Sequence, residues 1–168
     1  MSALLGANAA GAAEIIAVDV SPQKLEVASQ LGATKKVQAG PDAVKEIRDL
    51  TSGGVDFAFE MASSVPALQL AYDITKRGGT TITASLPKPE HRFSIPAVQL
   101  TAEERTLKGC YLGSCVPARD IPRFIALYLR GKLPVNRLLS EIVPIDGLNE
   151  AFDRLADAKS IRQVMTFN

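Results

Sequence analysis

One carboxylate in the sequence stands where it could bind the hydroxyl groups of a ribose. Asp19 lies near the end of Ile15–Val20, an apolar segment whose β-branched residues predict a strand. In dinucleotide-binding folds, an acidic residue about 20 positions after a glycine-rich loop accepts hydrogen bonds from the adenosine ribose. Counted back from Asp19, such a loop would end immediately before Met1. We therefore interpret Asp19 as a ligand-binding residue, with a solvated strand-end carboxylate as the alternative.

The other reactive residue types form no catalytic or metal-binding pattern. Tyr72 and Lys76 have the YxxxK spacing by which a lysine activates a tyrosine in short-chain dehydrogenases, but they fall on an ordinary sheet-covering helix. Cys110 and Cys115 match neither a zinc pair nor a redox CxxC, and His91 lies in a proline-rich loop. We expect no catalytic residue and no metal ligand, and we expect Tyr72 to pack against the sheet.

Short β-branched segments alternate with helical periods along the chain, which predicts a parallel sheet wrapped by helices. The fold class is α/β. Ser21 and Pro22 begin a helix that Gly32 ends, which is the usual placement of serine, proline and glycine at helix termini. Further helices are expected at 42–50, 66–76, 121–129 and 148–156, and further strands at 36–38, 55–61, 80–85, 93–95, 106–112, 141–144 and 163–167.

Composition excludes several classes of protein. Lys and Arg number 19 against 18 Asp and Glu, and the two signs are mixed, so neither nucleic acid nor an anionic membrane is an expected partner. The longest apolar segment is too short to span a bilayer, and two cysteines are too few to form a disulfide framework. A cytoplasmic protein is the default expectation.

The start of the α/β pattern differs from a complete nucleotide-binding unit. Such a unit opens with a hydrophobic strand, a glycine-rich turn and a helix. Here Ser2–Ala10 looks like the helix, and Ile15–Val20 is the next strand. We therefore expect a Rossmann-type doubly wound sheet that lacks its first strand. A change of composition near Gly113 predicts two parts, 1–112 and 113–168.

Several segments together resemble the zinc-containing medium-chain alcohol dehydrogenases. They are LLGANAAGAAEIIAVDVSPQKLEVASQLGAT, GGVDFAFE, KRGGTTI, RTLKGCYLGS and KSIRQVMTF, in the family's order and spacing. The resemblance implies that residues 1–112 are a partial NAD-binding domain and that 113–168 return to the catalytic domain. It also implies hydride transfer between an alcohol or aldehyde and NAD, with zinc only in a longer parent enzyme. We expect the 168 residues alone to be inactive.

The resemblance assigns cofactor roles to individual positions. Asp19 would bind the adenosine ribose hydroxyls and repel a 2′-phosphate, which favours NAD over NADP. Lys24 would donate to the same ribose, and Arg162 would bind the pyrophosphate, which suits its planar guanidinium. The remaining positions would flank the adenosine or hold the nicotinamide amide: Met61, Ala62, Ala84, Leu86, Cys110 and Leu112. Ser64 and Ser85 depart from vertebrate members, which carry arginine and glycine there.

Two other functions remain open at this stage. Methyltransferases use a similar sheet and also place an acid after the second strand, although they do not explain KSIRQVMTF. A non-catalytic dimerisation fragment is the other alternative. In the resembled family, subunits pair through an edge strand that 106–112 resembles, which implies a homodimer with an isologous interface.

Overall fold

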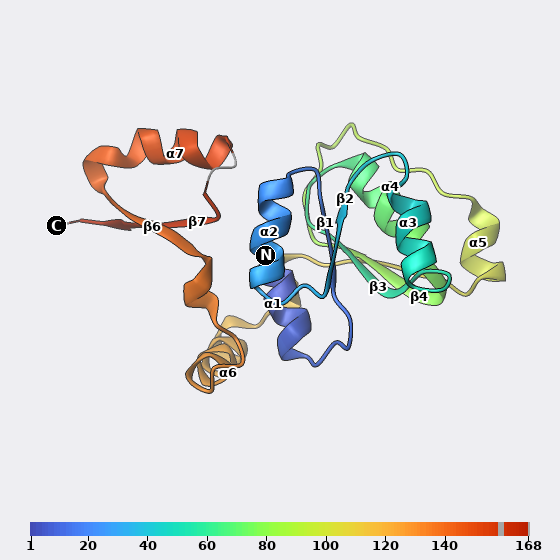
Figure 1. Cartoon of the computed structure of the whole chain (residues 1–168), viewed down its shortest axis with the longest axis horizontal. Helices are drawn as coiled ribbons and strands as arrows, with labels where there is room; N and C mark the ends of the chain where they lie inside the picture. The colour runs from blue at the N-terminus through green and yellow to red at the C-terminus, as the bar shows by residue number, and fades with distance from the viewer. Residues whose placement is uncertain (158–159, 168) are drawn as a thin grey trace. The chain divides into compact units, whose positions relative to one another are not determined.

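A computed structural model of the chain describes residues 1–157 and 160–167. The chain divides into two compact units (Figure 1), and each is described by itself. The first contains Met1–Ala17, Pro22–Lys36 and the described residues from Ala118 onward. The second contains Val18–Ser21 and Val37–Pro117. Ser160 and the residues after it are described, whereas Lys159, the first residue of the segment KSIRQVMTF, lies outside the described residues.

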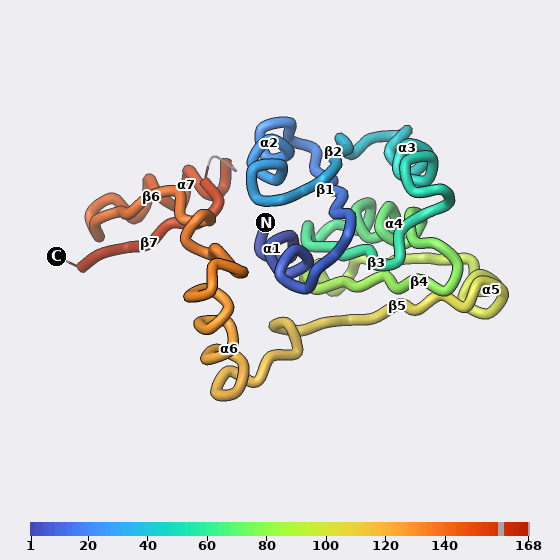
Figure 2. Tube along the Cα trace, turned by 60° about the horizontal axis from the view of Figure 1, so that its bottom comes forward, coloured from blue at the N-terminus to red at the C-terminus, as the bar shows by residue number. Residues whose placement is uncertain are grey.

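A three-stranded parallel sheet forms the centre of the second unit. It has the order β3 (Val55–Glu60), β4 (Thr75–Thr83) and β5 (Thr106–Gly109), and Figure 2 shows the three strands side by side. The pairs Glu60 with Thr83 and Thr83 with Gly109 set the register at the carboxyl ends of the strands. All three strands therefore end at one edge of the sheet.

Helices α3 (Ala43–Leu50), α4 (Val65–Ile74) and α5 (Ala97–Ala102) complete this unit. The Oγ of Ser64 caps α4 by accepting a hydrogen bond from Ala67 N at 3.3 Å. Tyr72 on α4 and Ile47 on α3 are fully buried, and Ile82 on β4 is nearly so. The packing expected for Tyr72 is thus confirmed, and the YxxxK spacing reflects a core residue.

The turn into β3 depends on a glycine. Gly54 has φ +133°, and a Cβ placed there would stand 2.5 Å from Ile74 O. Only glycine adopts this conformation without strain, and no side chain fits so close to another backbone. The pair Gly53-Gly54 therefore lets the chain enter the sheet beside the end of α4.

A separate two-stranded sheet pairs β1 (Ile16–Asp19) with β2 (Lys35–Gln38). Lys35 N donates to Ile15 O at 3.2 Å and Ala39 N donates to Asp19 O at 2.9 Å, so the residue offset is constant and the strands are parallel. Helix α2 (Pro22–Gln30) connects them. Parallel strands with helical connections agree with the expected Rossmann-type α/β fold.

The first unit has a small core around Leu5, Leu31 and Leu138. Leu5 belongs to α1 (Ser2–Ala9), Leu31 follows α2, and Leu138 precedes β6 (Leu139–Pro144). Helix α6 (Pro117–Leu129) leads toward this last segment. Strands β6 and β7 (Arg162–Thr166) pair in parallel and are connected by α7 (Leu148–Ala156). Arg154 of α7 donates from Nε to Oε1 of Glu141 on β6 at 2.9 Å.

Several expected elements differ from the structure. The strand expected at 80–85 begins earlier, at Thr75, and the helix expected at 121–129 begins at Pro117. Residues 93–95 form no strand, because proline residues surround them, and the helix α5 follows instead. The helix expected at 66–76 ends at Ile74, because buried Thr75 is extended and its hydroxyl bonds Ala71 O and Thr81 Oγ1. The strand expected at 106–112 ends at Gly109.

The backbone turns shortly after β5. A 3₁₀ turn over Leu112–Ser114 follows the strand, and its three residues have positive φ angles of 48°, 70° and 50°. Residues in that conformation cannot continue an extended strand. Leu112 therefore lies in a turn rather than at a strand end, which corrects the position expected for it.

Candidate functional site

The candidate site lies at the carboxyl ends of β3, β4 and β5. The parallel register brings residues that directly follow these strands to one edge of the second unit. Cys110 stays in register beyond β5, because its N–H donates to Thr83 O at 2.9 Å. Among the residues expected to bind the cofactor, this edge collects Met61, Ala62, Ala84 and Cys110. Ligands of open α/β sheets bind at this kind of edge.

Glu60 fixes the backbone at this edge, and sequence analysis assigned it no role. Its side chain is buried with the residue only 4% exposed. Oε1 accepts from Ala62 N at 2.6 Å, and Oε2 accepts from Thr83 Oγ1 at 2.7 Å and from Ser85 Oγ. One carboxylate thus ties the loop after β3 to the end of β4. The signal in the sequence is an acidic residue at an inward-facing position of an apolar strand.

The hydrogen bonds also keep Glu60 ionised. Burial opposes the charged form, but donation from Ser85, Thr83 and the amides of Ala62 and Ser63 outweighs it and holds the pKa of Glu60 below its ordinary value. Each donor satisfies a carboxylate lone pair that water would otherwise bind. The serine at position 85 therefore has a structural partner in this chain.

Glu60→Gln should lower stability near neutral pH and lose that effect in acid. Because the folded pKa is below the ordinary 4.5, ionised Glu60 stabilises the fold above pH 4.5, and this contribution is lost as pH falls through the folded pKa. We expect a loss of about 1 to 2 kcal/mol at pH 7. Urea unfolding from pH 7 to pH 3 measures it. The exposed Glu90→Gln is the control, and a Glu60→Gln deficit that persists undiminished at pH 3 would contradict the assignment.

Asp19 is held in a defined position at the end of β1. Its residue is half-buried, and Oδ1 accepts from Ser21 N at 2.9 Å in a tight turn. The backbone of Asp19 is fixed as well, because its carbonyl accepts from Ala39 N. The turn thus orients the carboxylate beyond the strand end.

The other expected cofactor residues are not all brought to this edge. Leu86 and Leu112 belong to the second unit and are 73% and 77% exposed, without packing that defines their position. Lys24 on α2 and Arg162 at the start of β7 belong to the first unit. Their assigned contacts therefore stay predictions.

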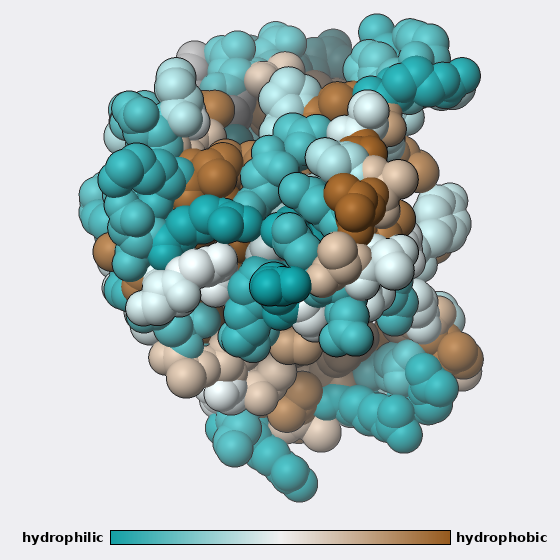
Figure 3. Space-filling model, turned by 90° about the vertical axis from the view of Figure 1, so that its right-hand side faces the viewer, coloured by the Kyte–Doolittle hydropathy of each residue, from teal (hydrophilic) through white to brown (hydrophobic). Residues whose placement is uncertain are grey.

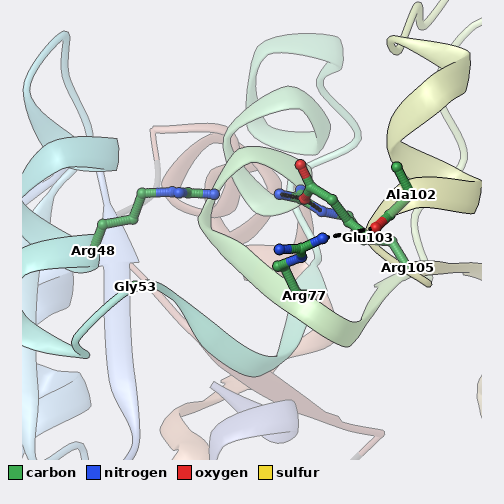
Figure 4. Close-up of a pocket in the computed structure, with 6 residues that line it drawn as sticks. All are labelled: Arg48, Gly53, Arg77, Ala102, Glu103 and Arg105. Atoms are coloured by element: carbon green, nitrogen blue, oxygen red, sulfur yellow. Dashed lines mark hydrogen bonds and ion pairs between the residues drawn. The ribbon is translucent and has the colours of Figure 1, made fainter.

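A further cavity lies at the opposite edge of the sheet. A pocket of about 40 Å³ adjoins Glu60, Thr83 and His91 at the carboxyl edge. A cavity of about 400 Å³ adjoins Gly53, Arg77 and Arg105 at the amino-terminal edge (Figure 4). Arg77 lies near Thr75, where β4 begins, and Arg105 directly precedes Thr106, where β5 begins. The cavity of about 400 Å³ is therefore at the opposite end of the strands from the candidate cofactor edge.

Two further findings concern metals and membranes. Within residues 1–157 and 160–167, no group of three or more His, Cys, Asp or Glu side chains could hold a metal ion. In the same part of the chain, no helix is both long and apolar enough to cross a membrane.

Parallel strands, crossover helices and polar groups at the carboxyl strand ends define a Rossmann-like α/β protein. Residues 1–130 match the zinc-binding dehydrogenase family. Because the match covers most of the chain, this protein belongs to that family.

Known relatives extend the match to nearly the whole chain. Alcohol dehydrogenase 1 of Cenchrus americanus is 32% identical over 169 residues, which cover 98% of this chain and 44% of the relative. Benzyl alcohol dehydrogenase of Acinetobacter calcoaceticus superposes with a TM-score of 0.94 at 30% identity, over 99% of this chain and 46% of that one. An alcohol dehydrogenase zinc-binding domain protein of Burkholderia ambifaria gives 0.93 at 30%, over 99% and 45%. The chain thus spans about half the length of the relatives it matches.

Proposed function

We propose that this chain is the dinucleotide-binding part of an NAD-dependent alcohol dehydrogenase. The observation that carries the proposal is the carboxyl edge of the second unit, where Glu60 fixes the ends of two parallel strands in a member of this family. NAD, when bound, accepts a hydride from an alcohol and returns it to an aldehyde. The residues of this chain bind and orient the cofactor, and zinc would belong to the rest of a longer enzyme.

The residues present fit NAD in charge and placement. Asp19 offers an oriented carboxylate to the adenosine ribose, and its charge disfavours a 2′-phosphate. Met61 and Ala62 would flank the adenosine, with Lys24 as a second ribose donor and Arg162 at the pyrophosphate. Backbone groups of Ala84, Leu86, Cys110 and Leu112 would hold the nicotinamide amide. Residues 1–112 would form the cofactor domain and 113–168 the return to the catalytic domain, in a cytoplasmic enzyme.

A chimera tests the function. Residues 1–168 would replace the matching 46% of the Acinetobacter benzyl alcohol dehydrogenase, with the remainder of that enzyme unchanged. We expect alcohol-dependent reduction of NAD by the chimera and none by the 168-residue chain alone, with or without zinc. Measurable zinc-dependent turnover by the chain alone, or a folded chimera that fails to bind NAD, would contradict the proposal.

The chain would also form a homodimer through the edge that β5 leaves open. All four residues of β5 are exposed, and β4 is its partner on one side. Since Cys110 N points toward β4, the alternate amides of Leu107 and Gly109 point away from it. Such an edge can pair with the same strand of a second copy about a two-fold axis.

Leu107→Pro should therefore reduce self-association. Proline removes the outward amide of Leu107 without removing a bond to β4, so pairing between copies would be lost. Sedimentation velocity would show a dimer for the parent chain and a monomer for Leu107→Pro. Leu107→Ala keeps the amide and should still dimerise. A monomeric parent chain at high concentration would refute pairing through this strand.

A further inference from the structure

The cavity at the amino-terminal edge of β3, β4 and β5 collects three arginine side chains. Arg48 comes from α3, Arg77 from β4, and Arg105 immediately precedes β5. Figure 4 shows Arg48 extending from its helix toward the guanidinium groups of Arg77 and Arg105. Glu103 is the single carboxylate among the lining residues. The lining therefore carries an excess of two positive charges.

Each arginine donates one hydrogen bond to a backbone carbonyl near a helix end. Two of the three have further N–H groups without a hydrogen-bond acceptor in the described residues. Arg48 Nε donates to Asp73 O at 3.0 Å, and Arg77 Nη2 donates to Ala102 O at 2.9 Å. Within the described residues, Nη1 and Nη2 of Arg48 and Nε and Nη1 of Arg77 make no hydrogen bond. Arg105 is different, because all three of its nitrogens are bound to Glu103 or Tyr72 O.

The positive charge of the lining favours an anion. Like charges that share a cavity repel each other, and Glu103 is already engaged by Arg105. The carboxylate of Asp56 is paired with Lys76 at 2.6 Å. The carboxylate of Asp73 accepts from Gln69 Nε2 at 3.0 Å on α4. An added anion would therefore relieve repulsion and occupy the remaining donors of Arg48 and Arg77.

We propose that this cavity binds a phosphate group of a small molecule. Guanidinium groups match phosphate oxygens in geometry and charge, and two forks from different elements can bind adjacent oxygens. A volume of about 400 Å³ admits a pyrophosphate or the phosphates of a nucleotide. Figure 3 shows hydrophilic side chains, with hydrophobic patches among them, on the side of the molecule that lies at the right of Figure 1. The site is separate from the carboxyl edge and independent of the proposed function.

Titration with inorganic pyrophosphate at constant ionic strength tests the proposal. The ¹⁵N-labelled chain should show saturable shifts of the Gly53 and Ala102 amides. Arg77→Gln should weaken binding about tenfold or more, because it removes a charge-assisted contact. Arg92→Gln is the matched control, since Arg92 is also exposed and also donates to a carbonyl, Pro89 O, at 2.9 Å.

Two further binding measurements make the result unambiguous. Arg48→Gln should weaken pyrophosphate as Arg77→Gln does, and Arg162→Gln should leave it unchanged. Tighter binding of ADP than of pyrophosphate, weakened by Arg77→Gln as pyrophosphate binding is, would assign the site to a nucleotide, and equal or weaker binding at this site would assign it to an inorganic anion. The proposal is overturned by an absence of saturable binding, by equal weakening in Arg92→Gln, or by weakening in Arg162→Gln alone.

Discussion

Arg105→Met should destabilise the second unit by about 3 kcal/mol. The Arg105 side chain is only 3% exposed. Its Nη1 donates to Tyr72 O at 2.7 Å, and its guanidinium lies 4.9 Å from the centre of the Tyr72 ring. Methionine preserves much of the apolar volume but removes the charged donor from Tyr72 O, a buried carbonyl of the last turn of α4 that then accepts only from Thr75 N. It also releases Glu103, which is bound at 2.6 Å through Arg105 Nη2.

Urea unfolding followed by circular dichroism measures this loss. Arg92→Met is the control, because Arg92 is exposed and its bond to Pro89 O lies on the surface, where we expect a change below about 0.5 kcal/mol. Equal stability of Arg105→Met and the parent chain would show that Arg105 does not secure the end of α4.

The regular elements could be predicted because local chemistry determines them. The strand before Asp19, the helix that begins at Pro22 and the helix 148–156 each have a clear period and defined ends. The parallel fold follows from their alternation. Met61 and Ala84 were identified through the family resemblance, and the parallel register brings both to one edge.

The side-chain network could not be predicted, because it depends on contacts between distant segments. Glu60 meets Ser85 across 25 positions, and Arg105 meets Tyr72 O across 33. No period or spacing in the sequence links these residues. The end of β5 was also missed, because Thr106–Leu112 alternates like a strand while positive φ angles beyond Tyr111 bend the chain. The same holds for the arginine cavity, whose three members come from separate elements.

Asp19→Gly should weaken NAD binding by about tenfold to a hundredfold and bring the NADP affinity closer to that of NAD. The carboxylate accepts from ribose hydroxyls, and hydrogen bonds to a charged group contribute about 1.5 to 3 kcal/mol. Glycine removes that acceptor together with the repulsion of a 2′-phosphate. The strand should persist, because the Asp19 backbone keeps its bond from Ala39 N. Asp42→Gly is the control, since Asp42 precedes α3 without a side-chain cap bond.

The dissociation constants of NAD and NADP, measured by calorimetry on the chimera and its Asp19→Gly variant, test the central claim most directly. We expect the chimera to prefer NAD, and the variant to lose most of that preference while Asp42→Gly retains it. Unchanged constants for both cofactors in Asp19→Gly would contradict the proposed role of Asp19 in dinucleotide binding.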